Sequence, residues 1–438
     1  MSFRTIPGSK EQYALLSFDK DGKERTDDKG GVDGVMSKEI LARVARQQPS
    51  HVFFFSHGWQ GDVAAACDQY NRWIKAMLDR TEDRNAVKGT FTPMWIGLHW
   101  PSLPFGDEEL GGSDFNADGG AMSPDYIVAT YLERLGLGSD AEPLLRTIVQ
   151  AHQRDAAATG LPQDAKRAYA NLAALAGHKS EGPSGPPDAD GTPFDPGATF
   201  EAAAATGTDF GGGGVLGGIL SPLRQLSYWT MKKRARSIGE SGMHRFVADL
   251  MNAAPNARFH LMGHSFGCIV VSSILGGPGA TQKLPRRVDS VALIQGAVSL
   301  WAFGDYVQQQ SLKGYFNPWV HRAAIRGPLV VSRSVHDRAV GTLYPWASAA
   351  SFADGSFDPE SDSDLPLYGA IGRFGIRGLP GVSFRPMLDT TGSYGFEAGK
   401  IYNLEASKFI AKGGGVAGAH SDIDGPQVAH ALWQAALV

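Results

Sequence analysis

The sequence predicts an α/β protein with a doubly wound, mostly parallel central sheet. Short apolar runs rich in β-branched and aromatic residues recur along the chain, and segments of helical periodicity separate them. The clearest run is "HVFFFSHGW" (51–59), in which Val52 and the three phenylalanines after it leave no polar face. Such a run is typical of a parallel strand covered by helices on both sides. Strands that alternate with helices in this way favour a parallel sheet.

The individual elements follow from local signals. The first predicted strand, 12–18, runs into the turn sequence "DKDG" and therefore looks like the first arm of a hairpin. After the strand at 51–59, Asp62 can cap a helix that extends to about Arg80, because apolar side chains recur there about every 3.6 residues. Further strands are predicted at 93–102, 258–263, 290–297, 328–335 and 400–410.

Between Ser102 and about Ser221 the sequence changes in character. An acidic, glycine-bearing segment is followed by alanine-rich helical stretches and then by Gly/Pro-rich segments. We therefore expect residues 1–101 and 223–438 to form the core and residues 102–222 to form a long helical, Gly/Pro-rich cap or lid insertion. The segment "FGGGGVLGGILSPL" (210–223) suits either a mobile lid with glycine hinges or an ordinary packed segment.

Composition excludes several classes of protein. The 438 residues are 42% hydrophobic and 20% charged, as in an ordinary globular enzyme, and the net charge of −4 argues against a dedicated nucleic-acid binder. The N-terminus lacks a signal-peptide pattern, and no apolar stretch reaches the roughly 18 residues of a membrane span. These observations predict a cytoplasmic protein without stable membrane insertion, with export by a signal-independent route left open. Cys67 and Cys268 are expected to be buried thiols.

One short stretch, "HLMGHSFGCIVV" (260–271), suggests a catalytic nucleophile. A strand that turns sharply into a helix strains its turn residue and brings the residues two places before and after it close together, so Gly263 and Gly267 suit a turn at Ser265. The pentapeptide is a weak signal by itself in a chain with 55 glycines. Here, however, an apolar strand precedes it and a helical segment follows it, so we expect Ser265 to present its hydroxyl as a nucleophile.

A serine nucleophile needs a base and a group that orients the base. His420 lies in "KGGGVAGAHSDIDG", a glycine-rich loop directly after the last predicted strand, where a proton shuttle is expected. Asp337, in "VVSRSVHDRAVG", stands at the end of the penultimate strand and is the expected acid. Asp305, in "LWAFGDY", remains an alternative acid. The chain order Ser265, Asp337, His420 is the order expected for such residues on successive strands.

The negative charge that develops on the substrate oxygen needs hydrogen-bond donors. The backbone N–H of Phe266, at the start of the helix after the nucleophile, is one expected donor. The second is the backbone N–H of Trp59, which Gly58 allows to point inward, while the side chains of His57 and Trp59 pack the loop.

No cofactor is expected. The sequence contains no Cys/His cluster with zinc spacing. A formal G-x-G-x-x-G match at Gly212, Gly214 and Gly217 follows no strand and therefore does not indicate a dinucleotide site.

Taken together, these motifs resemble those of the α/β-hydrolase superfamily, in particular lipase/esterase-like serine hydrolases. The resemblance covers roughly residues 10–101 and 223–438, and the motifs that carry it are "FFFSHGW", "LHWPS", "HLMGHSFG", "SVHDRAVG" and "GAHSD". It implies the α/β-hydrolase fold and cleavage of carboxylic (acyl) esters through a covalent acyl-enzyme. The long segment after "LHWPS" and the polar stretch from about 352 to 395 depart from the family pattern.

Carried onto this chain, the family roles fall on Ser265, Asp337 and His420 as the triad and on Trp59 and Phe266 as the oxyanion pair. The expected partner is a small-molecule or lipid acyl ester, and the sequence does not indicate an oligomeric state. An acyltransferase or amidase would use the same triad, and a catalytically silent binding module would need none of it.

The basic run "MKKRARSIGE" (231–240) has two interpretations. The first is a solvated helix face, and the second is attraction to an anionic lipid surface.

Overall fold

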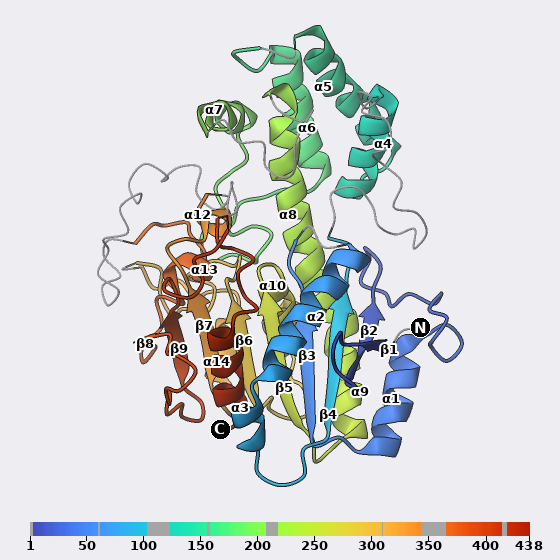
Figure 1. Cartoon of the computed structure of the whole chain (residues 1–438). Coiled ribbons are helices and arrows are strands. Elements are labelled where there is room, and N and C mark those ends of the chain that lie inside the picture. The colour runs from blue at the N-terminus through green and yellow to red at the C-terminus, as the bar shows by residue number, and fades with distance from the viewer. Residues whose placement is uncertain are drawn as a thin grey trace.

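The computed structural model describes residues 3–59, 62–102, 123–155, 158–206, 218–308, 310–342, 365–413 and 418–438. These residues form an α/β architecture in which a central sheet lies between two layers of helices and a group of helices stands at one end of the sheet (Figure 1).

The sheet of the described residues has nine strands in the order β1-β2-β4-β3-β5-β6-β7-β9-β8. β1 is antiparallel to β2, and every other neighbouring pair is parallel. The strands are β1 (Phe3–Thr5), β2 (Gln12–Ser17), β3 (His51–Ser56), β4 (Pro93–His99), β5 (Arg258–His264), β6 (Ser290–Ile294), β7 (Leu329–Arg333), β8 (Ser383–Pro386) and β9 (Ile401–Glu405). The predicted mostly parallel α/β sheet is confirmed.

Helices cover both faces of this sheet. The α-helices are α1 (Met36–Gln47), α2 (Val63–Asp79), α3 (Thr81–Asn85), α4 (Pro124–Leu135), α5 (Glu142–Arg154), α6 (Gln163–Leu175), α7 (Pro196–Thr206), α8 (Ser221–Ile238), α9 (His244–Ala253), α10 (Gly267–Gly276), α11 (Asn317–His321), α12 (Arg338–Thr342), α13 (Ile371–Phe374) and α14 (Pro426–Ala436). The expected capping of α2 is present, since Asp62 accepts a hydrogen bond from the backbone N–H of Ala65.

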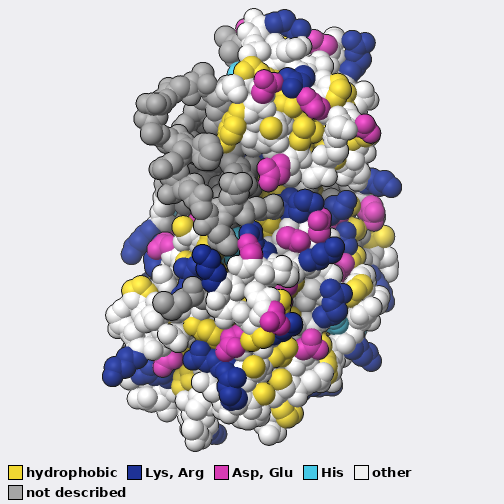
Figure 2. Space-filling view, turned by 90° about the vertical axis from the view of Figure 1, so that its right-hand side faces the viewer, with side chains coloured by type: hydrophobic (Ala, Val, Ile, Leu, Met, Phe, Trp, Pro, Cys, Tyr) yellow, Lys and Arg dark blue, Asp and Glu magenta, His cyan; other side chains and the backbone are white. Residues whose placement is uncertain are grey.

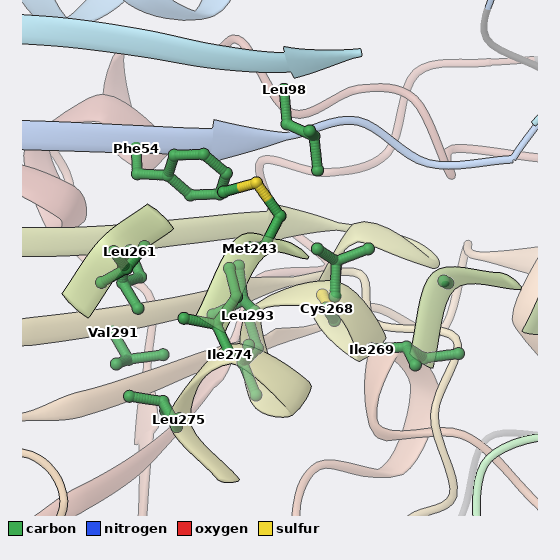
Figure 3. Close-up of a cluster of buried hydrophobic side chains, with 14 of the residues drawn as sticks. Phe54, Leu98, Met243, Leu261, Cys268, Ile269, Ile274, Leu275, Val291 and Leu293 are labelled. Carbon is green, nitrogen blue, oxygen red and sulfur yellow. The ribbon is translucent and has the colours of Figure 1, made fainter. Parts of the chain in front are cut away.

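The run of phenylalanines in β3 explains why two helical layers are needed. Val52 and Phe54 belong to the apolar cluster that contains residues of α1, α8, α9 and α10. Phe53 and Phe55 point to the opposite face and pack in the cluster that contains residues of α2 and α14. Figure 3 shows the first cluster around α10, with Phe54 near the other labelled side chains. Alternate side chains of one strand therefore fill both cores.

The two strands that the sequence analysis missed are β1 and β8, both at the edges of the sheet. The prediction that β2 forms a hairpin with the segment after the "DKDG" turn was wrong. β2 pairs with β1, which precedes it, whereas after the turn only an isolated antiparallel bridge joins Phe18 to Glu24. The other edge of β2 is taken by β4, which leaves no position for a following arm.

The inserted helices α4 to α7 stand beyond the ends of the strands (Figure 1). They have a hydrophobic cluster of their own, which also takes in Leu223 and Leu226 from the first part of α8. Farther along α8, Met231, Ala235 and Ile238 pack in the core of the sheet. One helix thus belongs to both units and crosses the expected boundary at residue 223. Residues 210–217 of the expected lid segment lie outside the described residues, as do residues 352–364 of the polar stretch.

The interpretation of 231–240 as a solvated basic face was wrong. The ammonium of Lys232 is fully buried and lies 2.5 Å from Asp190 Oδ1, while Arg236 pairs with Asp188 and Glu240. These two aspartates come from the loop before α7, so opposite charges from a distant segment cover Lys232 and Arg236. Arg234 is buried and donates to the carbonyl of Pro101 at 2.7 Å, whereas Lys233 is exposed. The described face in Figure 2 shows side chains of both charge signs on the insertion and on the body. None of the described helices is long and apolar enough to cross a membrane.

Candidate active site

The turn between β5 and α10 has the geometry expected of a nucleophile elbow. Ser265 has a φ of 55°, in the left-handed region that non-glycine residues rarely adopt. A Cβ atom at Gly263 would lie 2.5 Å from the carbonyl oxygen of Gly267, and a Cβ atom at Gly267 would collide with the carbonyl oxygen of Ser56. Both positions therefore require glycine, and the serine is held between them at the end of a central strand.

Hydrogen bonds fix the backbone of Ser265 on two sides. Its N–H donates to the carbonyl of Ile294 at 3.1 Å, at the end of β6. Its carbonyl accepts from Cys268 in α10 at 3.1 Å and from Ala297 at 3.2 Å. The strained conformation is thus determined by neighbouring elements rather than by the turn alone.

The structure brings together the expected base and the expected acid. His420 Nδ1 lies 2.8 Å from Asp337 Oδ2, and the Asp337 carboxylate is completely buried while the imidazole is 12% exposed. The loops that carry them are also paired, because Asp337 and Gly418 form an antiparallel bridge and Ala419 donates to the carbonyl of His336 at 2.9 Å. A carboxylate at Nδ1 favours the tautomer with the proton on that nitrogen, so Nε2 can accept a proton.

His264, the residue before the serine, ties this pair to the elbow. Its Nε2 lies 2.9 Å from the carbonyl oxygen of His420, and the centroids of the two rings are 4.9 Å apart. Burial lowers the pKa of His264 to about 3, so the ring is neutral at physiological pH. The neutral ring donates from Nε2, and its Nδ1 accepts from the side-chain amide of Gln69 at 3.3 Å. Sequence reasoning treated His264 only as part of the elbow and missed this role.

The described residues contain no hydrogen bond between Ser265 Oγ and His420. The two side chains are brought to the same edge of the sheet, since His420 packs on the residue next to Ser265. Catalytic hydrogen bonds are often long without substrate and tighten in the reacting complex, so this arrangement suits a proton transfer that begins when substrate binds.

The loop after β3 passes directly against the serine. A Cβ atom at Gly58 would lie 2.6 Å from Ser265 Cβ, so no larger residue fits there. His57 holds this loop, because its ring bonds the carbonyl of Gly58 at 2.8 Å and its backbone N–H donates to Tyr70 Oη at 2.9 Å. Within the described residues, no backbone hydrogen bond uses the N–H group of Trp59 or Phe266. Of the two expected oxyanion donors, Phe266 directly follows the serine in the chain and Trp59 directly follows Gly58, the residue that lies against it.

The side chain of Trp59 packs, as expected, and its neighbour is the ring of Phe266. Their ring centroids are 5.9 Å apart, and Tyr228 from α8 contacts both rings at 6.0 and 5.0 Å. The helix that joins the insertion to the core therefore contacts both residues that are expected to supply the oxyanion donors.

The alternative acid, Asp305, is engaged elsewhere. Its Oδ1 lies 2.6 Å from His321 Nε2 and 3.1 Å from Asn317 Nδ2. The hydrogen bond between Asp337 and His420 therefore favours Asp337 as the acid.

A further residue that the sequence analysis missed is Gln295, whose side-chain amide donates to Asp337 Oδ2 at 2.8 Å. No motif marks it, because its meaning depends on the adjacency of β6 and β7.

Among the described residues, no group of three or more His, Cys, Asp or Glu side chains is arranged to hold a metal ion. Comparison of the chain with protein-family models, with curated proteins and with solved structures gave no match.

Two buried histidines and one partly buried histidine, all with lowered pKa values, predict a loss of stability in mild acid. Burial lowers the pKa of His264 to about 3 and those of His51 and His178 to about 4. In the unfolded chain these groups bind protons below about pH 6.5, so their contribution to stability is complete above that pH and is lost as the pH falls toward 4. At pH 5.5 each of the three histidines is expected to lower the free energy of unfolding by about 1.4 kcal/mol, and together they lower it by about 4 kcal/mol.

Urea unfolding at pH 8, 6.5 and 5.5 measures how the free energy of unfolding depends on pH. His178→Gln removes one titrating ring and should reduce the loss between pH 8 and pH 5.5 by about 1.4 kcal/mol. An identical slope for the variant and the native chain would show that His178 does not contribute.

Proposed function

We propose that the chain is a serine hydrolase of the α/β-hydrolase type that cleaves carboxylic (acyl) esters through a covalent acyl-enzyme. The observation that carries this proposal is the buried Asp337–His420 pair, which lies at the same edge of the sheet as the strained Ser265 turn. The strand order, with the turn after the central strand β5, also supports it. A turn that needed only to connect β5 to α10 would require neither the strain nor the adjacent hydrogen-bonded Asp337–His420 pair.

Acylation begins when Ser265 Oγ attacks the carbonyl carbon of the ester. His420 Nε2 takes the hydroxyl proton as the new C–O bond forms, and the carbonyl electron pair moves onto oxygen. The tetrahedral intermediate then collapses, the bond to the leaving alcohol breaks, and His420 returns its proton to that alcohol. Water, activated by the same imidazole, releases the acid and restores Ser265.

Asp337 has two functions in this sequence of steps. It keeps the His420 proton on Nδ1 before the reaction, and it stabilises the imidazolium that exists while the tetrahedral intermediate is present. Its complete burial suits this work, because a charge shielded from water interacts more strongly with the ring.

The backbone N–H groups of Trp59 and Phe266 receive the developing oxyanion. The loss of one such donor typically costs about 3 to 4 kcal/mol of transition-state stabilisation. Tyr228 packs on both of their rings, so the substrate is expected to approach beside α8 and beneath the inserted helices. An apolar acyl group, from a small molecule or a lipid, suits aromatic surroundings of this kind.

Labelling with a fluorophosphonate probe tests the proposal. The native chain is expected to react at Ser265, as located by mass spectrometry of peptides, and Ser265→Ala is expected to lose the label. Ser273→Ala is a matched control in the following helix, since its buried hydroxyl has no hydrogen-bond partner and its removal should leave labelling unchanged. A folded native chain that resists the probe would contradict the proposal and favour a binding module.

Turnover of p-nitrophenyl esters of increasing chain length then defines the substrate. We expect hydrolysis of esters to exceed that of the matching p-nitroanilides. Preferential cleavage of the anilides, or transfer of the acyl group to an added alcohol in place of water, would reassign the chain to an amidase or an acyltransferase with the same triad.

A further inference from the structure

Gln295 bonds the same oxygen of the proposed catalytic carboxylate as His420 does. It directly follows β6, its side chain is completely buried, and its φ of 46° is in the left-handed region. Its Nε2 donates to Asp337 Oδ2 at 2.8 Å, and the same oxygen lies 2.8 Å from His420 Nδ1. One carboxylate oxygen is therefore fixed between an amide and an imidazole.

The orientation of this amide is determined by its partners. An ionised carboxylate only accepts hydrogen bonds, so the NH₂ group of Gln295 must face Asp337. The amide oxygen then faces Ser332 in β7, whose hydroxyl donates to it at 2.9 Å. Ser332 Oγ also accepts from the backbone N–H of Gln295 at 3.0 Å. A reversed amide would set oxygen against oxygen at the carboxylate, so a single orientation satisfies the network.

The choice of a neutral donor has a chemical consequence. The other groups that face Asp337 are His420, the backbone N–H of Val340 at 3.2 Å from Oδ1, and Arg373, which interacts with it electrostatically. A second cation bonded to Oδ2 would compete with the imidazolium for the negative charge. An amide instead fixes the direction of the carboxylate and leaves its charge available to His420.

We propose that Gln295 is a positioning residue, which orients the Asp337 carboxylate so that His420 keeps its proton on Nδ1 and offers Nε2 to Ser265. This inference rests on the proposed hydrolase function and assigns one more residue to the same site. Gln295 contacts no reacting atom and acts through Asp337. Its left-handed backbone fits such a role, because strain of this kind persists where surrounding contacts over-determine a conformation.

Gln295→Met tests the role with little change in volume. We expect kcat for p-nitrophenyl acetate to fall about 10- to 100-fold, the kinetic equivalent of one hydrogen bond to a charged group, with KM within about twofold. The matched control is Asn403→Ala. Asn403 is another completely buried amide, but it bonds only the backbone of Ile376. A loss of kcat no greater than that of Asn403→Ala at equal stability would assign Gln295 a merely structural role.

Gln295→Glu supplies a readout that packing does not affect. A protonated glutamic acid can donate to Asp337 Oδ2 as the amide does, whereas an ionised one repels that oxygen. The kcat/KM profile is therefore expected to gain a new alkaline limb, with activity nearest the native value at the acid side of the optimum. A profile parallel to that of the native chain at every pH would overturn the proposal.

A measurement without substrate separates this inference from the proposed function. In ¹⁵N-histidine NMR spectra, the proton on His420 Nδ1 should give a downfield signal in the native chain, and His420→Gln identifies it. We expect that signal to shift or broaden in Gln295→Met and to persist in Asn403→Ala. If the native chain hydrolyses no ester and Gln295→Met still alters the signal, the function fails and the positioning role stands. An unaltered signal overturns the positioning role itself.

Discussion

Replacement of Asp337 by asparagine is expected to lower kcat for ester hydrolysis about 10⁴-fold while the fold is retained. The asparagine amide can donate to His420 Nδ1, which favours the tautomer with the proton on Nε2. That nitrogen can then no longer accept the proton of Ser265. Steady-state kinetics with p-nitrophenyl acetate measures the effect, and circular dichroism checks the fold.

The chain contains a matched control for this substitution. Asp305 also bonds a histidine, His321, at 2.6 Å. Asp305→Asn therefore makes the same chemical change in a second Asp–His pair, and we expect kcat to stay within about twofold of the native value. A large loss in Asp305→Asn together with an active Asp337→Asn would show that the acid has been assigned to the wrong residue.

Removal of the carboxylate from the buried ion pair between the insertion and α8 is expected to lower the free energy of unfolding more than the other substitutions do. In Asp190→Ala, the fully buried ammonium of Lys232 loses the carboxylate oxygen that lies 2.5 Å from it. Burial lowers the pKa of Lys232, and Asp190 opposes that effect, so the variant leaves a charge in an environment that disfavours it. The expected loss in the free energy of unfolding is about 3 to 5 kcal/mol, measured by urea denaturation.

Two further variants test the cause of that loss. Lys232→Met combined with Asp190→Leu removes both charges and should recover most of the stability, because a buried pair is often replaceable by apolar side chains of similar volume. Asp21→Ala breaks an exposed pair with Lys20 and should cost less than about 1 kcal/mol. Equal losses for Asp190→Ala and Asp21→Ala would contradict the assigned role of burial.

The sequence predicts those parts of the fold whose signals are local. The parallel strands are recognisable because a strand covered on both faces, such as β3, must be apolar at every position. β1 and β8 are short, partly exposed edge strands, "FRT" and "SFRP", so neither has a distinctive pattern. The hairpin prediction failed because a turn sequence marks a change of direction and does not determine which segment pairs with the strand.

Long-range partners account for the other differences. The helical sequence around Lys232 cannot indicate that Asp190, 42 positions earlier, covers it. Similarly, Gln295 carries no motif, and its side-chain partners come from β7 (Ser332) and from the loop after it (Asp337). Asp337 and His420 were within reach of sequence reasoning because residues after parallel strands gather at one edge of the sheet.

Helix α8 limits how this chain can be shortened by engineering. An excision of residues 102–222 would leave Leu223 and Leu226 without the side chains that now shield them. The apolar side chains at the start of α8, just before Tyr228, would then be exposed to solvent, and we would expect the truncated protein to aggregate. A shortened core therefore needs polar replacements on the first part of α8, and a transplanted insertion should bring its own version of this helix.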